Sequence, residues 1–210
     1  MNPVGPEQLI IPILTDLYKW GKSSLQKLKK PGMYEVLNYE STLEILDPKG
    51  KQAKFSKFEE LKFLQDNVIA IQDQAWGDGK ILFDYRCTPG VPVDFYRSGH
   101  KTHILISLRD VKQKGDQIKS NLEWNIKNGF LNSSGYWATD INHYTRKMKV
   151  IILFPKERPP MKLLITETNR QNSKELPTEI ITRLPDKHWQ VTWEKRNPRL
   201  HEHYILKWEW

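Results

Sequence analysis

The sequence predicts an all-β protein, an antiparallel β-sandwich of about ten strands preceded by one N-terminal amphipathic α-helix. From residue 33 onward, short runs alternate apolar with polar residues, and turn residues separate them. This part of the chain contains no second long stretch of helical periodicity. A parallel α/β sheet needs helices between its strands, so the pattern excludes that class. We therefore expect a helix in residues 1–32 and a β-sandwich domain in residues 33–210.

The predicted helix rests on an apolar stripe between residues 6 and 30. Leucine, isoleucine and tryptophan recur at helical spacing, while lysines gather toward the end of the segment, where the helix dipole favours them. Pro31-Gly32 then ends the helix. The stripe could pack on its own domain, dock on a partner or a second copy, or lie on a membrane surface. The residues assigned to this face are Leu9, Ile13, Leu17 and Trp20.

The strands are predicted from period-2 runs between turns. Residues 47–50, 77–79 and 88–90 carry turn chemistry, built from Gly, Pro and Asp, and separate the first runs. The clearest strand is residues 117–127, which alternate an apolar face with a polar one. The continuous apolar run 150–154 predicts a strand that is buried on both sides or central in a sheet. The side chains expected in the core are Trp124, Val150, Ile152, Phe154, Trp193, Leu206 and Trp208.

The segment HEHYILKWEW, residues 201–210, could be a metal site or a closing strand. On a strand His201 and His203 would share a face, but a metal needs further ligands. The nearest acid of that parity, Glu209, lies roughly 20 Å away by strand rise, which is too far for one ion. Since Tyr204, Leu206, Trp208 and Trp210 share the other face, we predict a strand and no metal.

The remaining histidines, acids and the cysteine do not form a recognisable catalytic set. His100 and His103 would point to opposite faces of a strand, and the His143–Asp140 pair has no serine in a nucleophile frame. Cys87 ends a predicted strand, and no glycine-rich phosphate loop occurs. No catalytic residue, metal ligand or cofactor is predicted. A metal-dependent enzyme of unknown reaction is kept as an alternative.

The chain is basic, with 33 Lys and Arg against 25 Asp and Glu. A basic surface attracts polyanions, so nucleic acid or anionic lipid is a second alternative partner. Residues 145–149 and 156–162 carry the densest basic runs, but they flank one predicted strand at its two ends.

Cysteine content and the N-terminus favour a cytoplasmic location. Cys87 is the only cysteine, which fits a reducing compartment. The first residues lack a positive region and a cleavage site, so no signal peptide is expected. No apolar run is long enough for a transmembrane helix. The second alternative would instead place the protein peripherally on a membrane.

A non-catalytic recognition module is the function that this pattern favours. Loops on a rigid β scaffold are where binding residues usually lie. Residues 86–92 and 131–136 form two such loops. We expect Tyr136, Trp137 and Arg86 to contact a ligand, although packing explains Trp137 equally well. The N-terminal helix would couple this module to its own domain or to a partner.

Overall fold

The computed structural model describes residues 32–210, which are built from β-strands in three sheets with two short 3-10 turns. This confirms the all-β class and its predominantly antiparallel pairing. The predicted N-terminal helix, with Leu9, Ile13, Leu17 and Trp20, lies outside the described residues. No helix among the described residues is long and apolar enough to cross a membrane.

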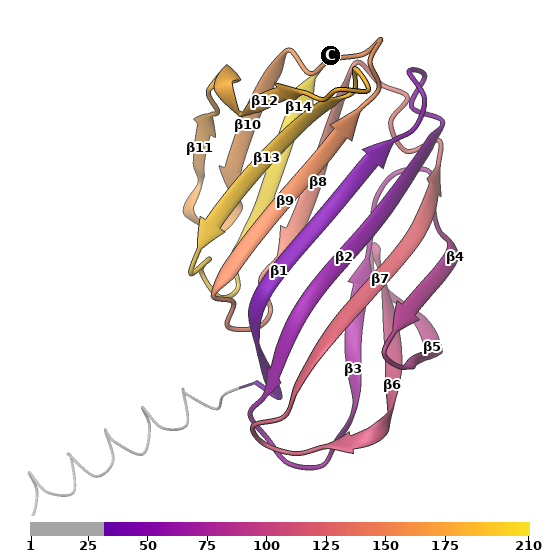
Figure 1. The fold of residues 1–210 in the computed structure, drawn as a ribbon, viewed down its shortest axis with the longest axis vertical. Helices are drawn as coiled ribbons and strands as arrows, with labels where there is room; N and C mark the ends of the chain where they lie inside the picture. The colour runs from indigo at the N-terminus through magenta and orange to yellow at the C-terminus, as the bar shows by residue number, and fades with distance from the viewer. Residues whose placement is uncertain (1–31) are drawn as a thin grey trace, which may run out of the picture. The chain divides into compact units, whose positions relative to one another are not determined.

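The largest sheet has seven strands and forms one face of the domain (Figure 1). Its central pair, β1 with β9, is parallel, whereas every other neighbouring pair is antiparallel. The sequence predicted predominantly antiparallel pairing and did not indicate which pair would be parallel. In spatial order the strands are β12 (Ile181–Arg183), β13 (Trp189–Arg196), β9 (Lys147–Phe154), β1 (Tyr34–Ile45), β2 (Gln52–Phe63), β7 (Gln117–Lys127) and β4 (Lys80–Thr88).

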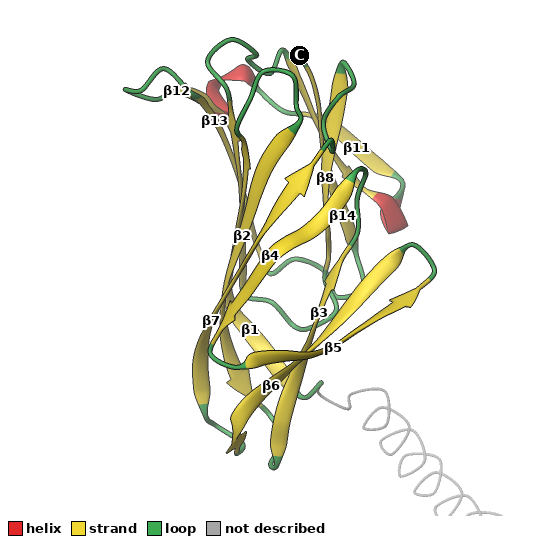
Figure 2. Cartoon of the chain, turned by 90° about the vertical axis from the view of Figure 1, so that its right-hand side faces the viewer, coloured by secondary structure: helices red, strands yellow, loops and turns green. Residues whose placement is uncertain are grey.

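Two smaller sheets lie on the same side of the large one, as the edge-on view shows (Figure 2). The four-stranded sheet has the order β11 (Asn172–Glu175), β10 (Lys162–Glu167), β14 (His203–Glu209) and β8 (Ser134–Asp140). The three-stranded sheet has the order β3 (Val68–Ala75), β6 (Lys101–Lys112) and β5 (Val91–Ser98). The 3-10 turns are Thr168–Arg170 and Thr178–Ile180.

The hydrophobic core lies between the large sheet and the two smaller ones. Six of the seven side chains predicted for the core are buried, and Trp193 is half-buried. Trp193 lies on β13, near one side of the large sheet, where it packs against Tyr204 at a ring distance of 5.6 Å. Strand β9 alternates buried with half-buried residues, so the apolar run 150–154 is central in its sheet rather than buried on both faces.

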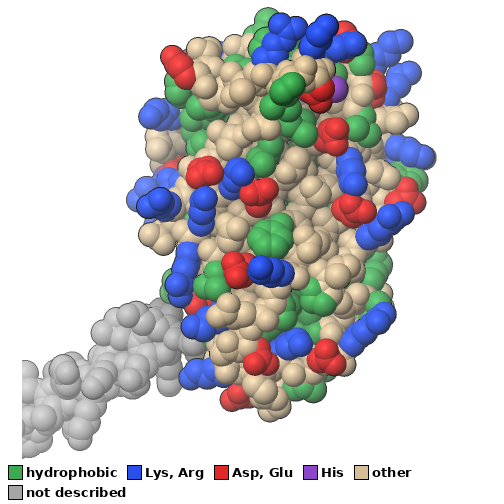
Figure 3. Space-filling view, viewed as in Figure 1, with side chains coloured by type: hydrophobic (Ala, Val, Ile, Leu, Met, Phe, Trp, Pro, Cys, Tyr) green, Lys and Arg blue, Asp and Glu red, His purple; other side chains and the backbone are tan. Residues whose placement is uncertain are grey.

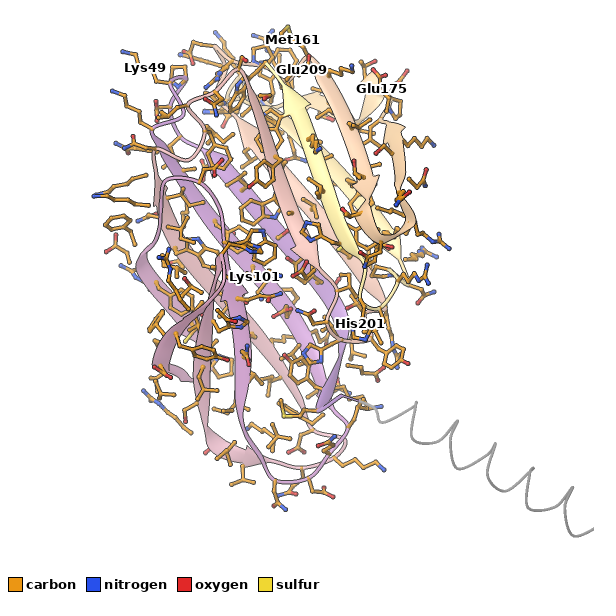
Figure 4. All side chains as sticks on the ribbon, turned by 180° about the vertical axis from the view of Figure 1, so that it is seen from behind. Lys49, Lys101, Met161, Glu175, His201 and Glu209 are labelled. Carbon is orange, nitrogen blue, oxygen red and sulfur yellow. The ribbon has the colours of Figure 1, made fainter. Side chains whose placement is uncertain are left out.

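The segment from His203 to Glu209 is a strand, as predicted, and it lies inside the four-stranded sheet between β10 and β8. His201 precedes the strand in a left-handed turn with φ of 62°. The two histidines therefore do not share a strand face, contrary to the sequence expectation. Figure 4 shows His201 and Glu209 at opposite ends of this strand.

Candidate functional site

Two neighbouring cavities lie between the large sheet and the strands β3 and β8. Their volumes are about 580 and about 440 Å³. The residues Trp76, Trp124, Trp137 and Ala138 line both of them, so the two cavities adjoin each other, and we refer to them together as the cleft. We call the larger one the aromatic cavity and the smaller one the charged cavity, after the side chains described below.

The sides of the cleft are the edges of two strands. Neighbouring residues of a strand point to opposite faces, so consecutive residues line one cavity only where the strand edge borders it. Residues 134–138 of β8 line the aromatic cavity, and residues 72–76, from β3 into the turn after it, line the charged cavity. Among the described strands, β8 pairs only with β14, and β3 pairs only with β6. Each therefore has one edge without a strand partner in residues 32–210.

The backbone groups on the free edge of β8 follow from its pairing with β14. The Ile141 amide donates to the Glu202 carbonyl at 3.0 Å, and the Trp210 amide donates to the Ser133 carbonyl at 3.2 Å. Antiparallel ladder bonds engage every second residue of a strand. The odd-numbered residues of β8 therefore face β14, and the even-numbered residues direct their N–H and C=O groups to the free edge. Tyr136 and Ala138 lie in the middle of that even-numbered set.

Side chains from β3, β6 and β14 converge on the last residue of β8. The Gln74 amide donates to Asp140 Oδ2 at 3.1 Å, and Lys101 forms an ion pair with the same oxygen. His203 Nδ1 lies 2.5 Å from Asp140 Oδ1. Burial raises the pKa of Asp140, but hydrogen bonds from His203 and Lys101 outweigh it and lower the pKa to about 2. The ammonium of Lys101, labelled in Figure 4, also lies over the ring of Trp76 at 4.5 Å.

Large rings line the aromatic cavity. Two of them, Trp124 and Trp137, pack on Phe55, at 4.2 and 4.5 Å between ring centroids, and Phe55 itself lines the charged cavity. Trp208 covers Gly135, where an added Cβ atom would lie 2.5 Å from the indole. Glycine at this position of β8 is therefore what lets the Trp208 ring lie flat against the strand. Charged side chains complete the lining: Asp78, Lys162, Glu175, Lys207 and Glu209.

The charged cavity contains a buried cluster of one cation and two carboxylates. Lys57 Nζ lies 2.6 Å from Asp73 Oδ1 and 3.1 Å from Glu59 Oε2. The exposed fractions of these side chains are 11% for Lys57, 5% for Asp73 and 15% for Glu59. Burial opposes the charge of Lys57, but Asp73 and Glu59 outweigh it and hold the lysine pKa well above its usual value. Burial raises the pKa of Glu59, against the opposing effect of Lys57.

Two polar atoms that line this cavity have no partner within residues 32–210. Asp73 Oδ2 and His143 Nδ1 are buried and form no hydrogen bond there. His143 stacks on Tyr34 at 4.0 Å, and burial together with the charge of Lys57 lowers its pKa to about 4. The imidazole is therefore neutral at pH 7. Buried polar groups normally have partners, so these atoms mark a place suited to a polar ligand.

Two of the three predicted ligand-contacting residues border the aromatic cavity, with side chains on opposite faces of β8. Trp137 and Tyr136 both line the aromatic cavity, and Tyr136 is 41% exposed. Arg86 does not join them. It pairs with Glu123 at 3.7 Å and lines a separate pocket of about 300 Å³. Glu123 and Trp124 are neighbours on β7, so they point to opposite faces of the large sheet, and Arg86 lies on the face away from the cleft.

Sequence reasoning missed Lys57, Glu59 and Asp73, although a signal for them exists. In β2, Lys57 and Glu59 share the parity of Phe55 and Leu61, which are 2% and 0% exposed. Asp73 likewise shares the parity of core residues in β3. Charged residues at core positions of a strand are rarely buried without a partner. The pattern of alternation, read for its exceptions, would have indicated a buried charged site.

The other chemically suggestive residues stay apart. Among residues 32–210, no group of three or more His, Cys, Asp or Glu side chains is placed to hold one metal ion. Cys87 is a free, half-buried thiol, and burial raises its pKa.

The basic segment 145–149 is largely paired with acids. Arg146 contacts Glu35 at 3.0 Å, and Lys149 contacts Glu40 at 3.2 Å. Figure 3 shows basic and acidic side chains interspersed over the large-sheet face of the domain.

Comparison with known proteins identifies a similar fold. No protein-family model matches the sequence, and no curated protein matches it. A mutant M1 zinc metallopeptidase from Deinococcus radiodurans, solved with a Tyr-Ser-Ala substrate, is similar over 83% of this chain, with 9% identity and a TM-score of 0.51. A two-domain M1 zinc metallopeptidase mutant bound to L-tryptophan gives a TM-score of 0.50 at 9% identity. The chain spans 42% and 43% of these two structures. At this identity the likeness shows a shared β-rich domain fold.

Proposed function

We propose that this protein is a non-catalytic recognition module that binds a ligand in the cleft between β3 and β8. The observation that carries the proposal is the aromatic cavity, about 580 Å³ in volume and lined by Trp76, Trp124, Trp137 and Trp208. Ligand pockets typically have volumes of roughly 300–1,000 Å³, with mainly apolar walls and a few placed polar groups. The volume of this cavity lies in that range, and its lining combines aromatic rings with charged side chains.

The cavity favours a flat or branched apolar group joined to a polar part. Trp124 and Trp137 both pack on Phe55, so their rings are held in place before a ligand arrives. A rigid aromatic wall lowers the conformational entropy that binding must overcome. The polar part would meet the charged cavity, where Asp73 Oδ2 has no partner among residues 32–210.

A neutral fluorescent probe tests the proposal. We expect 1-aminoanthracene to bind with stoichiometry near one and to gain fluorescence as it leaves water. Trp137→Ala should weaken this binding at least tenfold, because it removes a ring that lines both cavities. Trp189→Ala is the matched control: Trp189 is a half-buried indole on β13 and lines neither cavity.

Unchanged probe affinity in Trp137→Ala, with both variants folded by near-UV circular dichroism, would contradict binding in the cleft. Equal losses in the two variants would contradict it as well, because they would indicate a general loosening of the core.

The coupling role of the N-terminal helix is a separate part of the proposal. The apolar face of Leu9, Ile13, Leu17 and Trp20 would dock on the module itself or on a partner protein. Analytical ultracentrifugation of the full chain and of a chain starting at Met33 tests self-association. A polyanion partner, a peripheral membrane location and a metal-dependent reaction stay predictions of the sequence alone.

A further inference from the structure

We propose that the ligand of the cleft is a peptide segment in extended conformation, which adds a strand to the free edge of β8 and places a lysine or arginine side chain beside Asp73. This inference rests on the proposed function and names the class of ligand. It commits to a peptide because the cleft offers strand edges as well as side chains.

The edge of β8 that has no strand partner among residues 32–210 is long enough for a short peptide. Strand β8 has seven residues, so its edge is about 20 Å long and accommodates roughly six peptide residues at 3.3 Å each. Its even-numbered residues direct backbone N–H and C=O groups into the cleft. An extended peptide satisfies such groups by strand addition, and pockets beneath it select alternate side chains. The two cavities are placed as such pockets, because both are bordered by the same edge.

The protection that exposed edges usually carry is missing here. Natural proteins guard free edges with proline, lysine or inward charges. The sequence of β8, SGYWATD, contains no proline and one charged residue, Asp140, which is already bonded to Lys101 and His203. An edge that lacks these devices is suited to pairing.

Charge selects the side chain in the charged cavity. The cluster holds two carboxylates, Asp73 and Glu59, against the single cation Lys57. The Asp73 side chain is buried and its Oδ2 has no partner among the described residues. A buried carboxylate oxygen without a donor is unfavourable, and a guanidinium or ammonium supplies donors together with the missing charge. A glutamate at the same position of the peptide would be repelled.

Two matched peptides test the proposal by fluorescence polarisation. The first is the fluorescein-labelled, end-blocked hexapeptide Thr-Val-Thr-Arg-Thr-Val, and the second has Glu in place of Arg. Val, Arg and Val share one face of the extended peptide and would point into the cleft. We expect the Arg peptide to bind at least tenfold more tightly than the Glu peptide. Asp73→Asn should reduce the affinity for the Arg peptide at least tenfold. It should also reduce the difference in affinity between the Arg and Glu peptides.

Backbone pairing is tested by Ala138→Pro, which removes an N–H from the free edge and leaves the ladder to β14 intact. It should weaken the Arg peptide at least tenfold. Ala138→Ser, which keeps the N–H, is the control and should bind as the parent does. If Ala138→Pro does not fold, N-methylation of the peptide at alternate amides replaces it. In an extended peptide, every second amide faces β8 and donates to it. Methylation of that set of amides should abolish binding.

The probe 1-aminoanthracene is titrated in parallel to separate the two proposals. Probe binding without any difference between the Arg and Glu peptides, or with full peptide binding after N-methylation of either set, overturns the strand-addition proposal and leaves the cleft as a site for another ligand. Absence of probe binding together with absence of peptide binding overturns both proposals.

Discussion

Lys57→Met is expected to destabilise the domain by about 3–5 kcal/mol, the usual range for removing one partner of a buried ion pair. Lys57 Nζ contacts Asp73 at 2.6 Å and Glu59 at 3.1 Å, and all three side chains are largely buried. Methionine replaces the aliphatic part of the lysine side chain and lacks only the ammonium, so lost packing is a small part of the effect. What remains is two largely buried carboxylates that have lost the cation they share.

Urea denaturation at pH 7, followed by tryptophan fluorescence, measures the change in the free energy of unfolding. The triple variant Lys57→Met, Glu59→Leu, Asp73→Leu is the control, because it removes the charges together. Replacing a whole buried ion cluster by apolar side chains is often neutral or stabilising. The triple variant should therefore recover most of the loss.

The pH dependence gives a second check on the same variant. Without Lys57 the two carboxylates resist ionisation in the folded state, so their folded pKa values rise above the unfolded ones. A group with a raised folded pKa contributes stability below its unfolded pKa and loses it as the pH rises through the folded pKa. The defect of Lys57→Met should therefore shrink as the solution is acidified. Two results would contradict an uncompensated buried charge in Lys57→Met: a loss of unfolding free energy below about 1 kcal/mol at pH 7, or a loss that becomes larger in acid.

Three further predictions follow from other contacts. The pKa of Asp140 is lowered to about 2 from 3.8, so its contribution to stability is present above pH 3.8 and is lost as the pH falls toward 2. In Asp140→Asn the melting temperature should therefore fall less steeply between pH 3.8 and pH 2, and an unchanged slope would contradict the lowered pKa. Trp208→Ala should lower the free energy of unfolding, measured in urea, by about 3–5 kcal/mol, because Trp208 is 1% exposed and contacts Phe154 and Phe130. A loss under about 1 kcal/mol would contradict its place in the core. Deleting residues 207–210 should abolish the cooperative melt, because it removes three of the seven residues of an interior strand. A deletion variant that melts as the parent does would show that the sheet does not need the C-terminal part of β14.

Local periodicity was enough to predict most of the strands. The alternation in β7 placed Trp124 in the core correctly, and the period-2 pattern of residues 203–209 predicted β14. These features depend on neighbouring residues, which a sequence displays directly. The prediction that His201 shares a strand face with His203 was wrong, because a single residue in the left-handed region changes which way its side chain points. The alternation of polar and apolar residues does not indicate such a residue.

Long-range pairing is where the sequence prediction stopped. The parallel pairing of β1 with β9 places Tyr39 beside Met148. The sequence of neither strand indicates which strand will be its partner. The cleft also depends on long-range pairing. Strands β3 and β8 belong to different sheets, so the packing of the sheets decides how close they lie. Tyr136 and Trp137 could be predicted as candidates, although they lie on β8 and not in the loop that the sequence predicted. The cluster of Lys57 with Asp73 depends on strands from two sheets.

The position of β14 between β10 and β8 has a consequence for how the chain folds as it is made. Strands β8 and β10 leave the ribosome well before residues 203–209, so the four-stranded sheet has an empty centre during that interval. Both of its waiting strands then expose edges that later become paired, and such edges can capture other chains. Contacts between distant segments also slow folding, because the loop between them must close first. We expect the nascent chain to need chaperone protection until β14 emerges and is inserted.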